Sequence, residues 1–244
     1  MDEILYEVDA GVAVVAVNAP QRRNALTPQL AASLIAQLDR AADDRSIGSL
    51  VLRAEGASFC AGADLATVRA AMPDPLGEPA FSDLGVIYEL FRRLVRLPIP
   101  TLAAVQGPAV GAGINLALAC DVRIVSEDAE FIGFARAGVH PGGGHLELLR
   151  SIDRQSAAWL ALFNQPISAV EAVRTGLAAR MTGADELIAE TMAVARAAAA
   201  DPELSRMVTA SYRAIDGMEA RHNLAVHVER APQVWSLRRS HRDG

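Results

Sequence analysis

The sequence predicts a layered α/β fold followed by a helical C-terminal part. Through about residue 133, short apolar runs rich in β-branched residues alternate with longer segments in which apolar residues recur at helical spacing. Near residue 165 the composition shifts and the chain turns helical. We therefore expect a core over residues 1–165 and a helical region over residues 166–244 packed on it.

Turn and capping residues delimit the first elements. Residues 12–17 form a short β-branched run, which Asn18-Ala19-Pro20 ends. Thr27 and Pro28 then provide an N-cap and a proline at the first helical position, so the spacing predicts a helix over 28–42. Residues 49–53 should form the next strand. The apolar positions of the helix are Leu30, Leu34, Ile35, Leu38 and Ala41.

A second helix is predicted over 82–97, where Pro98 and Pro100 end it. It is preceded by a stretch rich in proline and glycine, Met72 to Pro79, which we expect to be a mobile loop and a candidate cover for an active site. Beyond the helix, the expected elements are a strand over 101–105, a glycine-rich turn, a helix at 112–120 and strands at 121–126 and 130–133.

The C-terminal part begins with a capping signal. Ser168 and Glu171 form a capping-box pattern, and Gly176 closes that short helix. An alanine-rich helix over 184–200 is interrupted at Asp201-Pro202, and the chain from 202 to about 230 is expected to be helical as well.

The charge composition excludes several kinds of chemistry. All 23 basic residues of the 244 are arginine, and 29 acidic residues bring the net charge to −6. Without any lysine there is no Schiff-base, biotinylated or phosphate-loop lysine. The negative balance argues against nucleic acid or an anionic membrane as a general partner.

Two cysteines, Cys60 and Cys120, lie in apolar surroundings and are expected to be buried thiols rather than a disulfide. The N-terminus lacks a signal-peptide pattern, and no apolar run approaches the length of a membrane span. We therefore expect a cytoplasmic protein. No spacing typical of metal ligands is present, and we expect no metal.

Two glycine- and alanine-rich turns are candidate sites. Phe59 to Leu65 reads Phe-Cys-Ala-Gly-Ala-Asp-Leu, and Gly107 to Gly113 reads Gly-Pro-Ala-Val-Gly-Ala-Gly. Each lies between a predicted strand and a helix, so a ligand could approach the backbone closely and meet free N–H groups at a helix start. Two such turns meeting at one point would hold an oxyanion, although each alone is also explained by tight packing.

The motifs and their order cover about residues 5 to 215. They are Arg22-Arg23-Asn24-Ala25-Leu26, Phe59 to Leu65, Gln106 to Gly113 leading to Ala119-Cys120-Asp121, Gly138 to Gly144, and Ser168-Ala169 with Gly176-Leu177. In this order they resemble the crotonase superfamily, also called the enoyl-CoA hydratase/isomerase family. The resemblance is specific to the superfamily and far less specific to one reaction.

The resemblance implies a spiral core of ββα units, a C-terminal helical trimerisation region, and a homotrimer or a dimer of trimers. It also implies an acyl-CoA thioester as substrate, with coenzyme A arriving as part of it and no separate cofactor. The backbone N–H groups of Ala61 and Ala112 would form an oxyanion hole for a thioester enolate. The implied substrate-binding residues are Arg22, Arg23, Ala25, Leu26, Ala61, Gly62, Ala63, Asp64, Leu65, Gly111 and Phe134.

Departures from the family pattern affect the expected reaction. A family hydratase uses two glutamates, and here those positions are Asn115 and Phe134. Some family isomerases carry an acid after the proline of the later glycine turn, where this chain has Gly142. None of the three residues transfers protons at neutral pH, so hydration of enoyl-CoA is doubtful.

Asn115, His140 and His145 are the candidate polar groups of the catalytic site. The two histidines flank the Pro-Gly-Gly-Gly turn and could act as acid or base, although they are also explained as turn caps or solvent contacts. Asp64 caps the following helix or transfers protons. Arg22 and Arg23 offer charge to CoA phosphates or stay solvated. Three functions remain: an enolate-stabilising enzyme, an acyl-CoA binding protein without turnover, or another family reaction such as isomerisation, decarboxylation or thioester hydrolysis.

Overall fold

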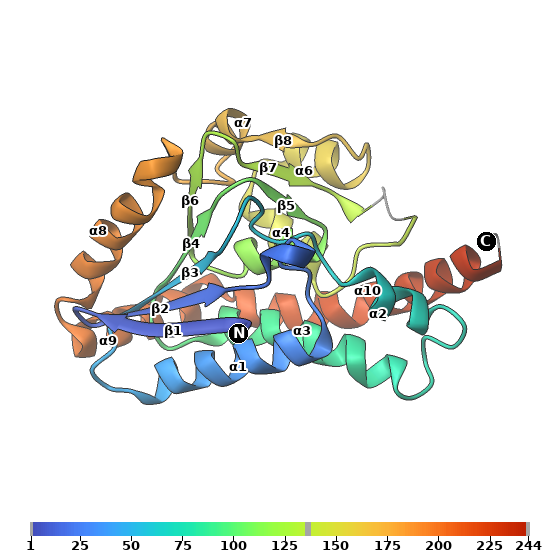
Figure 1. The fold of residues 1–244 in the computed structure, drawn as a ribbon, viewed down its shortest axis with the longest axis horizontal. Coiled ribbons are helices and arrows are strands. Elements are labelled where there is room, and N and C mark those ends of the chain that lie inside the picture. Colours follow the sequence, from blue (N-terminus) through green and yellow to red (C-terminus); the bar gives the residue numbers. More distant parts are fainter. Residues whose placement is uncertain (1, 135–137, 243–244) are drawn as a thin grey trace.

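The structure is a computed structural model that describes residues 2–134 and 138–242. Within these residues the strands form two sheets (Figure 1), one in the order β1-β2-β3-β4-β6-β9 and one in the order β5-β7-β8. β1 pairs antiparallel with β2, and the other neighbours in the larger sheet are parallel. The strands are β1 (Ile4–Asp9), β2 (Val12–Val17), β3 (Ser49–Ala54), β4 (Thr101–Val105), β5 (Pro108–Val110), β6 (Val122–Ser126), β7 (Glu130–Ile132), β8 (Ile167–Ser168) and β9 (Arg180–Thr182).

Helices cover the larger sheet on both faces, as Figure 1 shows for α8 on one side and α1 and α3 on the other. The helices are α1 (Pro28–Asp43), α2 (Leu65–Ala71), α3 (Ala80–Arg96), α4 (Ala112–Leu118), α5 (His145–Leu148), α6 (Arg154–Ala161), α7 (Ala169–Arg174), α8 (Leu187–Ala199), α9 (Pro202–Asp216) and α10 (Met218–Arg242).

The two faces explain why β2 is apolar along its whole length. Every residue of Val12–Val17 is buried. Val12 and Val14 belong to the cluster that packs under α8, whereas Ala13, Val15 and Val17 belong to the cluster on the opposite face. A strand covered on both sides needs no polar alternation, so its sequence is a continuous apolar run.

Most predicted elements of the first half are confirmed within one or two residues, including α1, α3, β3, β4 and β6. The prediction of a turn over residues 107–113 is wrong in one respect, because Pro108–Val110 form the short strand β5. β1 was not predicted. Four of its six residues are exposed, and Glu7 and Asp9 interrupt the apolar residues, so it lacks the continuous apolar run of β2. The 72–79 segment is a loop between α2 and α3.

The C-terminal helices pack on the core. The capping box of Ser168 and Glu171 is present at α7, and Asp201 accepts a hydrogen bond from the N–H of Leu204 to start α9. The helical stretch after residue 202 is not continuous, because Gly217 adopts a left-handed conformation (φ 64°) and separates α9 from α10. α10 then packs on α3 and α5. Over the described residues, no helix is long and apolar enough to cross a membrane.

Candidate active site

The two glycine-rich turns lie side by side. Cys60 pairs with Ala109 in a parallel bridge, and the Val110 N–H donates to the Cys60 carbonyl at 2.9 Å. The contact is close enough to require glycine at Gly113, where a Cβ atom would lie 2.3 Å from the Cys60 carbonyl oxygen. The close approach that small residues allow is therefore present between the turns.

The segment at residues 22–26 joins the same assembly. Leu26 pairs with Ala63 in a second parallel bridge. Buried Asn24 fixes the segment, because its side chain accepts from the Ala19 N–H and donates to the carbonyls of Glu55 and Ser58, each at 2.8 Å. Asn24 has φ 55°, a conformation that asparagine tolerates better than most residues. Sequence analysis assigned it no role, although asparagine in a tight turn was the available signal.

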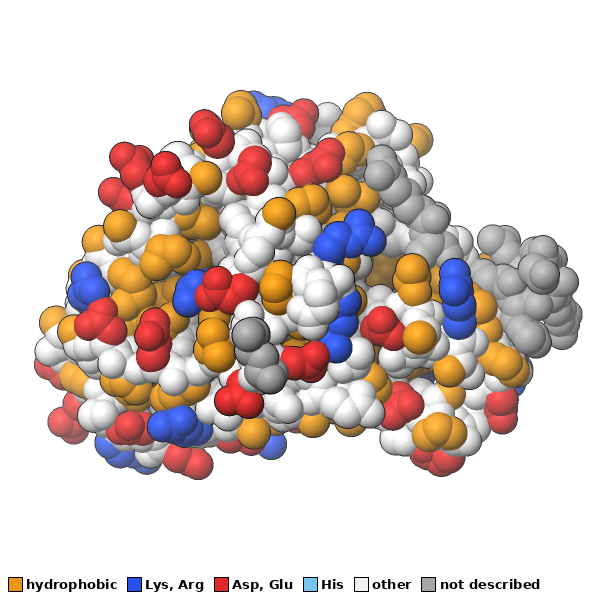
Figure 2. Space-filling model, in the orientation of Figure 1, with side chains coloured by type: hydrophobic (Ala, Val, Ile, Leu, Met, Phe, Trp, Pro, Cys, Tyr) orange, Lys and Arg blue, Asp and Glu red, His pale blue; other side chains and the backbone are white. Residues whose placement is uncertain are grey.

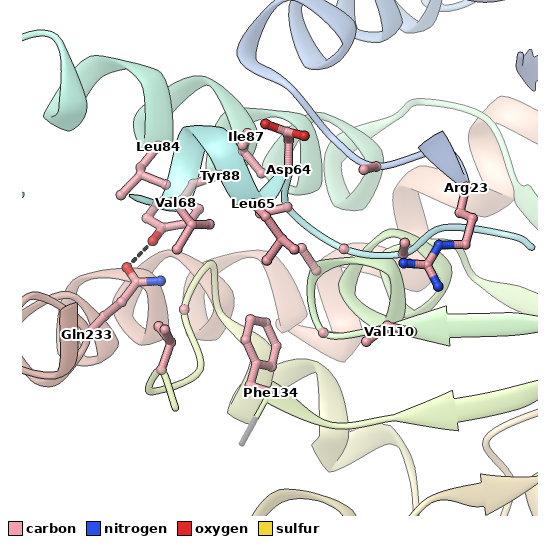
Figure 3. Close-up of a pocket in the computed structure, with 18 of the residues that line it drawn as sticks. Arg23, Asp64, Leu65, Val68, Leu84, Ile87, Tyr88, Val110, Phe134 and Gln233 are labelled. Atoms are coloured by element: carbon pink, nitrogen blue, oxygen red, sulfur yellow. Dashed lines mark hydrogen bonds between the residues drawn. The ribbon is translucent and has the colours of Figure 1, made fainter. Parts of the chain in front are cut away.

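These segments, together with α2, α3, α10 and Phe134, enclose a cavity of about 530 Å³ (Figure 3). On the outer surface, Figure 2 shows a hollow bordered on one side by basic side chains. Leu26 does not line the cavity, contrary to its predicted role, because it is fully buried in the core. The predicted residues on the wall are Arg22, Arg23, Ala25, Ala61, Gly62, Ala63, Asp64, Leu65, Gly111, Ala112 and Phe134.

The prediction that Ala61 supplies an oxyanion donor is wrong. Its N–H donates to the Arg23 carbonyl at 2.9 Å and is therefore occupied. The Ala63 N–H has no hydrogen-bond partner among the described residues, since only the neighbouring Gly62 and Asp64 bond to Leu26. Ala112 is the first residue of α4, so its N–H has no partner within the helix. Ala63 and Ala112 therefore each bring to the cavity wall a backbone N–H that has no hydrogen-bond partner among the described residues.

The two arginines differ in their partners. Arg22 forms an ion pair with Glu3, with its two terminal nitrogens 2.8 and 2.9 Å from the carboxylate oxygens. Arg23 is exposed, and no carboxylate pairs with it among the described residues. In Figure 3 its guanidinium lies at one end of the cavity, opposite Gln233. Arg23 is therefore the better placed to meet an anionic group.

Asp64 acts as a helix cap, which is one of the two roles predicted for it; the other is proton transfer. Its Oδ1 accepts from the N–H groups of Ala66 and Thr67, both at 3.0 Å. Figure 3 shows its carboxylate turned away from Phe134. The geometry therefore supports capping of α2 rather than proton transfer into the cavity.

Asn115 and His145 form a pair that lies behind the cavity wall, and neither lines the cavity. Asn115 Nδ2 donates to the Gly142 carbonyl at 2.9 Å, so its Oδ1 is the acceptor for His145 Nδ1 at 2.7 Å. His145 is therefore protonated at Nδ1. Burial, with a smaller contribution from His140, lowers the pKa of His145 to about 3. His145 also contacts Phe134 edge-on at 4.8 Å between ring centroids.

His140 does not line the cavity either. Its Nδ1 lies 2.6 Å from the Pro141 carbonyl oxygen, and its backbone N–H donates to Ser236 on α10. The structure therefore places both predicted histidines away from the cavity surface. His140 serves the turn, as the alternative explanation held.

Sequence analysis missed three residues whose positions depend on tertiary packing. Tyr88 of α3 and Gln233 of α10 line the cavity. Glu229 of α10 is buried and accepts from the N–H groups of Gly144, His145 and Leu146 at 2.8 to 3.1 Å, which fixes the glycine turn. Burial raises the pKa of Glu229, and the three N–H donors oppose that shift. No local motif brings α10 to this turn.

Comparisons with known proteins agree with this geometry. A family model for enoyl-CoA hydratase/isomerase matches residues 7–232. The chain belongs to the enoyl-CoA hydratase/isomerase family. It is 40% identical to the probable enoyl-CoA hydratase EchA14 of Mycobacterium tuberculosis, over 97% of this chain and 93% of that protein. It is 37% identical to 1,2-epoxyphenylacetyl-CoA isomerase of Escherichia coli, over 78% of this chain and 73% of that one.

A solved structure of an enoyl-CoA hydratase/isomerase from Xanthobacter autotrophicus Py2 matches with a TM-score of 0.85 at 31% identity, over 96% of this chain and 88% of that one. The fold of this family member is therefore of the crotonase type, as predicted. Besides its arginines, the titratable residues on the described cavity wall are Asp64, which caps α2, and Tyr88. Burial raises the pKa of Tyr88 to about 12.

Proposed function

We propose that this protein binds an acyl-CoA thioester in the cavity, with the thioester oxygen between the N–H groups of Ala63 and Ala112. The observation that carries the proposal is that these two donors have no hydrogen-bond partner among the described residues and lie on the cavity wall that both glycine-rich turns line. Fixed backbone donors of this kind stabilise the negative charge of an enolate without reorganising. Arg23, at the end of the cavity opposite Gln233, would face the CoA phosphates.

A binding experiment tests the oxyanion donors directly. Octanoyl-CoA and the thioether octyl-CoA differ in the carbonyl group, so two hydrogen bonds should make the thioester bind about tenfold more tightly. Ala112→Pro removes one donor at the first helical position, where proline is tolerated, and should reduce that preference severalfold in calorimetric titration. Equal affinity for both ligands in the unchanged protein would contradict the proposal.

Arginine variants provide the matched control. Arg23→Gln should weaken thioester and thioether alike, because it removes charge facing the common CoA part. Arg22→Gln should weaken them less, since Arg22 is already paired with Glu3. If either variant lost the preference for the thioester over the thioether, the arginine would also affect the binding of the thioester oxygen, and the two contributions would not be independent.

Hydration is expected to be slow, because Asn115 lies behind the wall and Phe134 cannot titrate. Acid–base groups contribute about 10²- to 10⁴-fold to such reactions. Crotonyl-CoA should therefore be hydrated at least about 100-fold more slowly than by a family hydratase that carries both glutamates, in a spectrophotometric assay. A comparable rate would refute this.

The second candidate function is acyl-CoA binding without turnover. It is favoured because, besides its arginines, the described cavity wall carries only Asp64 and Tyr88 as titratable residues. Exchange of the acyl α-hydrogens in D₂O, followed by NMR, separates the two. Exchange above the rate without protein supports enolate stabilisation and an isomerase-, decarboxylase- or thioesterase-type reaction, whereas its absence supports binding alone.

The homotrimer or dimer of trimers stays a prediction. The candidate contact is an apolar strip on α9, whose exposed side chains include Met207, Val208 and Ile215. Sedimentation velocity would distinguish the two assemblies from a monomer. We also propose that the protein is located in the cytoplasm.

A further inference from the structure

The end of the cavity opposite Arg23 is apolar except at one point. Two polar side chains, Tyr88 of α3 and Gln233 of α10, meet there and come from opposite sides of the space (Figure 3). The apolar residues around them are Val68, Leu84, Ile87, Phe91, Val139 and Leu237. A purely hydrocarbon ligand would not require a polar pair at this place.

The hydrogen bond between Tyr88 and Gln233 leaves the Gln233 amide N–H groups available as donors. The Tyr88 hydroxyl donates to Gln233 Oε1, which fixes the orientation of the amide. Gln233 Nε2 has no hydrogen-bond partner among the described residues. In Figure 3 the amide nitrogen lies on the side of Gln233 that faces the cavity. Both side chains are only 7% exposed, so bulk water does not readily satisfy these N–H groups.

The amide is held against the glycine turn. A Cβ atom at Gly142 would lie 2.1 Å from Gln233 Nε2, so the amide packs directly against the turn and would have to move if this residue carried a side chain. The Gly142 carbonyl already accepts from Asn115 Nδ2. The turn therefore limits the space of the Gln233 amide, and the Gly142 carbonyl is already hydrogen-bonded to Asn115.

The charges at this end favour an uncharged partner. Arg230 has its guanidinium carbon 5.2 Å from the Tyr88 ring centroid and 4.3 Å from that of Phe81, and its charge acts on the Tyr88 hydroxyl. It does not line the cavity. A carboxylate beside Gln233 would therefore meet no arginine on the described part of this apolar wall, and burying a charge without direct pairing is costly.

From these contacts we propose that the acyl group carries an uncharged oxygen beyond its reacting carbons, as a keto or hydroxyl group, and that Gln233 recognises it. Gln233 Nε2 donates to this oxygen, and Tyr88 is a positioning residue that holds the amide. The inference rests on the proposed acyl-CoA function and adds the class of acyl group. A site built to hydrogen-bond a ligand oxygen discriminates against ligands that lack it.

Calorimetric titration with a series of octanoyl-CoA derivatives tests the inference. The series carries one keto group at each carbon from the fourth to the seventh, and octanedioyl-CoA supplies a terminal carboxylate. At least one keto derivative should bind about tenfold more tightly than octanoyl-CoA. Gln233→Met, which keeps the length of the side chain, should bring that ratio close to one, and Tyr88→Phe should lower it in part. Gln155→Met, at an exposed position on α6, should leave it unchanged.

The outcomes separate this inference from the function on which it rests. If octanoyl-CoA binds but no keto derivative binds more tightly, recognition of an oxygen is refuted and the acyl-CoA site stands. If octanedioyl-CoA binds more tightly than every keto derivative, the uncharged oxygen is refuted. A ratio that survives Gln233→Met refutes the role of Gln233. If octanoyl-CoA itself does not bind, the proposed function falls and this inference falls with it.

Discussion

Replacing Gly113 with alanine is expected to destabilise the protein by about 3 kcal/mol and to abolish acyl-CoA binding. The added Cβ would lie 2.3 Å from the Cys60 carbonyl oxygen and 2.9 Å from the Cys60 Cβ, so the two turns must separate. Overpacking of a core typically costs about 1–3 kcal/mol, and here the contact is with backbone that cannot rotate away. Urea unfolding followed by circular dichroism, with calorimetry on octanoyl-CoA, measures both effects.

Gly85 provides the matched control, because it is also a helical glycine. A Cβ atom there meets no other atom within 4 Å. Gly85→Ala should therefore raise stability by about 0.5–1 kcal/mol through the backbone entropy of the unfolded chain. If both alanine variants had the same stability, the close contact between the turns would be wrong.

Lowering the pH from 7 to 4.5 is expected to remove about 2–3 kcal/mol of stability through His145 alone. Burial lowers its pKa to about 3 in the folded protein, whereas the unfolded chain has the ordinary value of 6.5. Between those values the unfolded state binds a proton that the folded state does not. The stabilisation is therefore complete above pH 6.5 and is lost as the pH falls toward 3.

The His145→Gln variant isolates this effect, since glutamine can still donate to Asn115 Oδ1 but does not titrate. The difference in unfolding free energy between pH 7 and 4.5 should be smaller in the variant by about 2–3 kcal/mol. His222, whose pKa burial lowers to about 4, weakens both proteins in the same direction. Glu229, whose pKa is raised, acts in the opposite direction in both. Identical pH dependence in the two proteins would show that His145 is not a buried neutral residue.

The fold could be predicted well where local signals were strong. Thr27 with Pro28, and Ser168 with Glu171, mark helix starts through contacts within a few residues, and both are present in the structure. β1 escaped prediction because its pairing with β2, rather than its composition, makes it a strand. β5 escaped because only three residues of the glycine-rich turn pair with β7.

The candidate site could be predicted only as far as its motifs reach. Each turn, like the segment at residues 22–26, is a continuous stretch of sequence, so the resemblance could identify most of the wall residues. Which N–H groups stay free depends on pairing between distant parts of the chain. The resemblance therefore points to Ala61, although its N–H donates to the Arg23 carbonyl. Gln233 and Glu229 could not be predicted, since they reach the site through the packing of α10 on α3 and α5.

The cavity wall draws on residues as far apart in sequence as Gln21 and Leu237. A nascent chain can complete the β2 and β3 pairing early in synthesis, but it cannot close the wall until residue 237 has left the ribosome. A ligand that needs the whole wall can therefore bind only after the segment that carries Leu237 has been made. A bound ligand would then tie these distant segments together and raise the temperature at which they come apart as one unit.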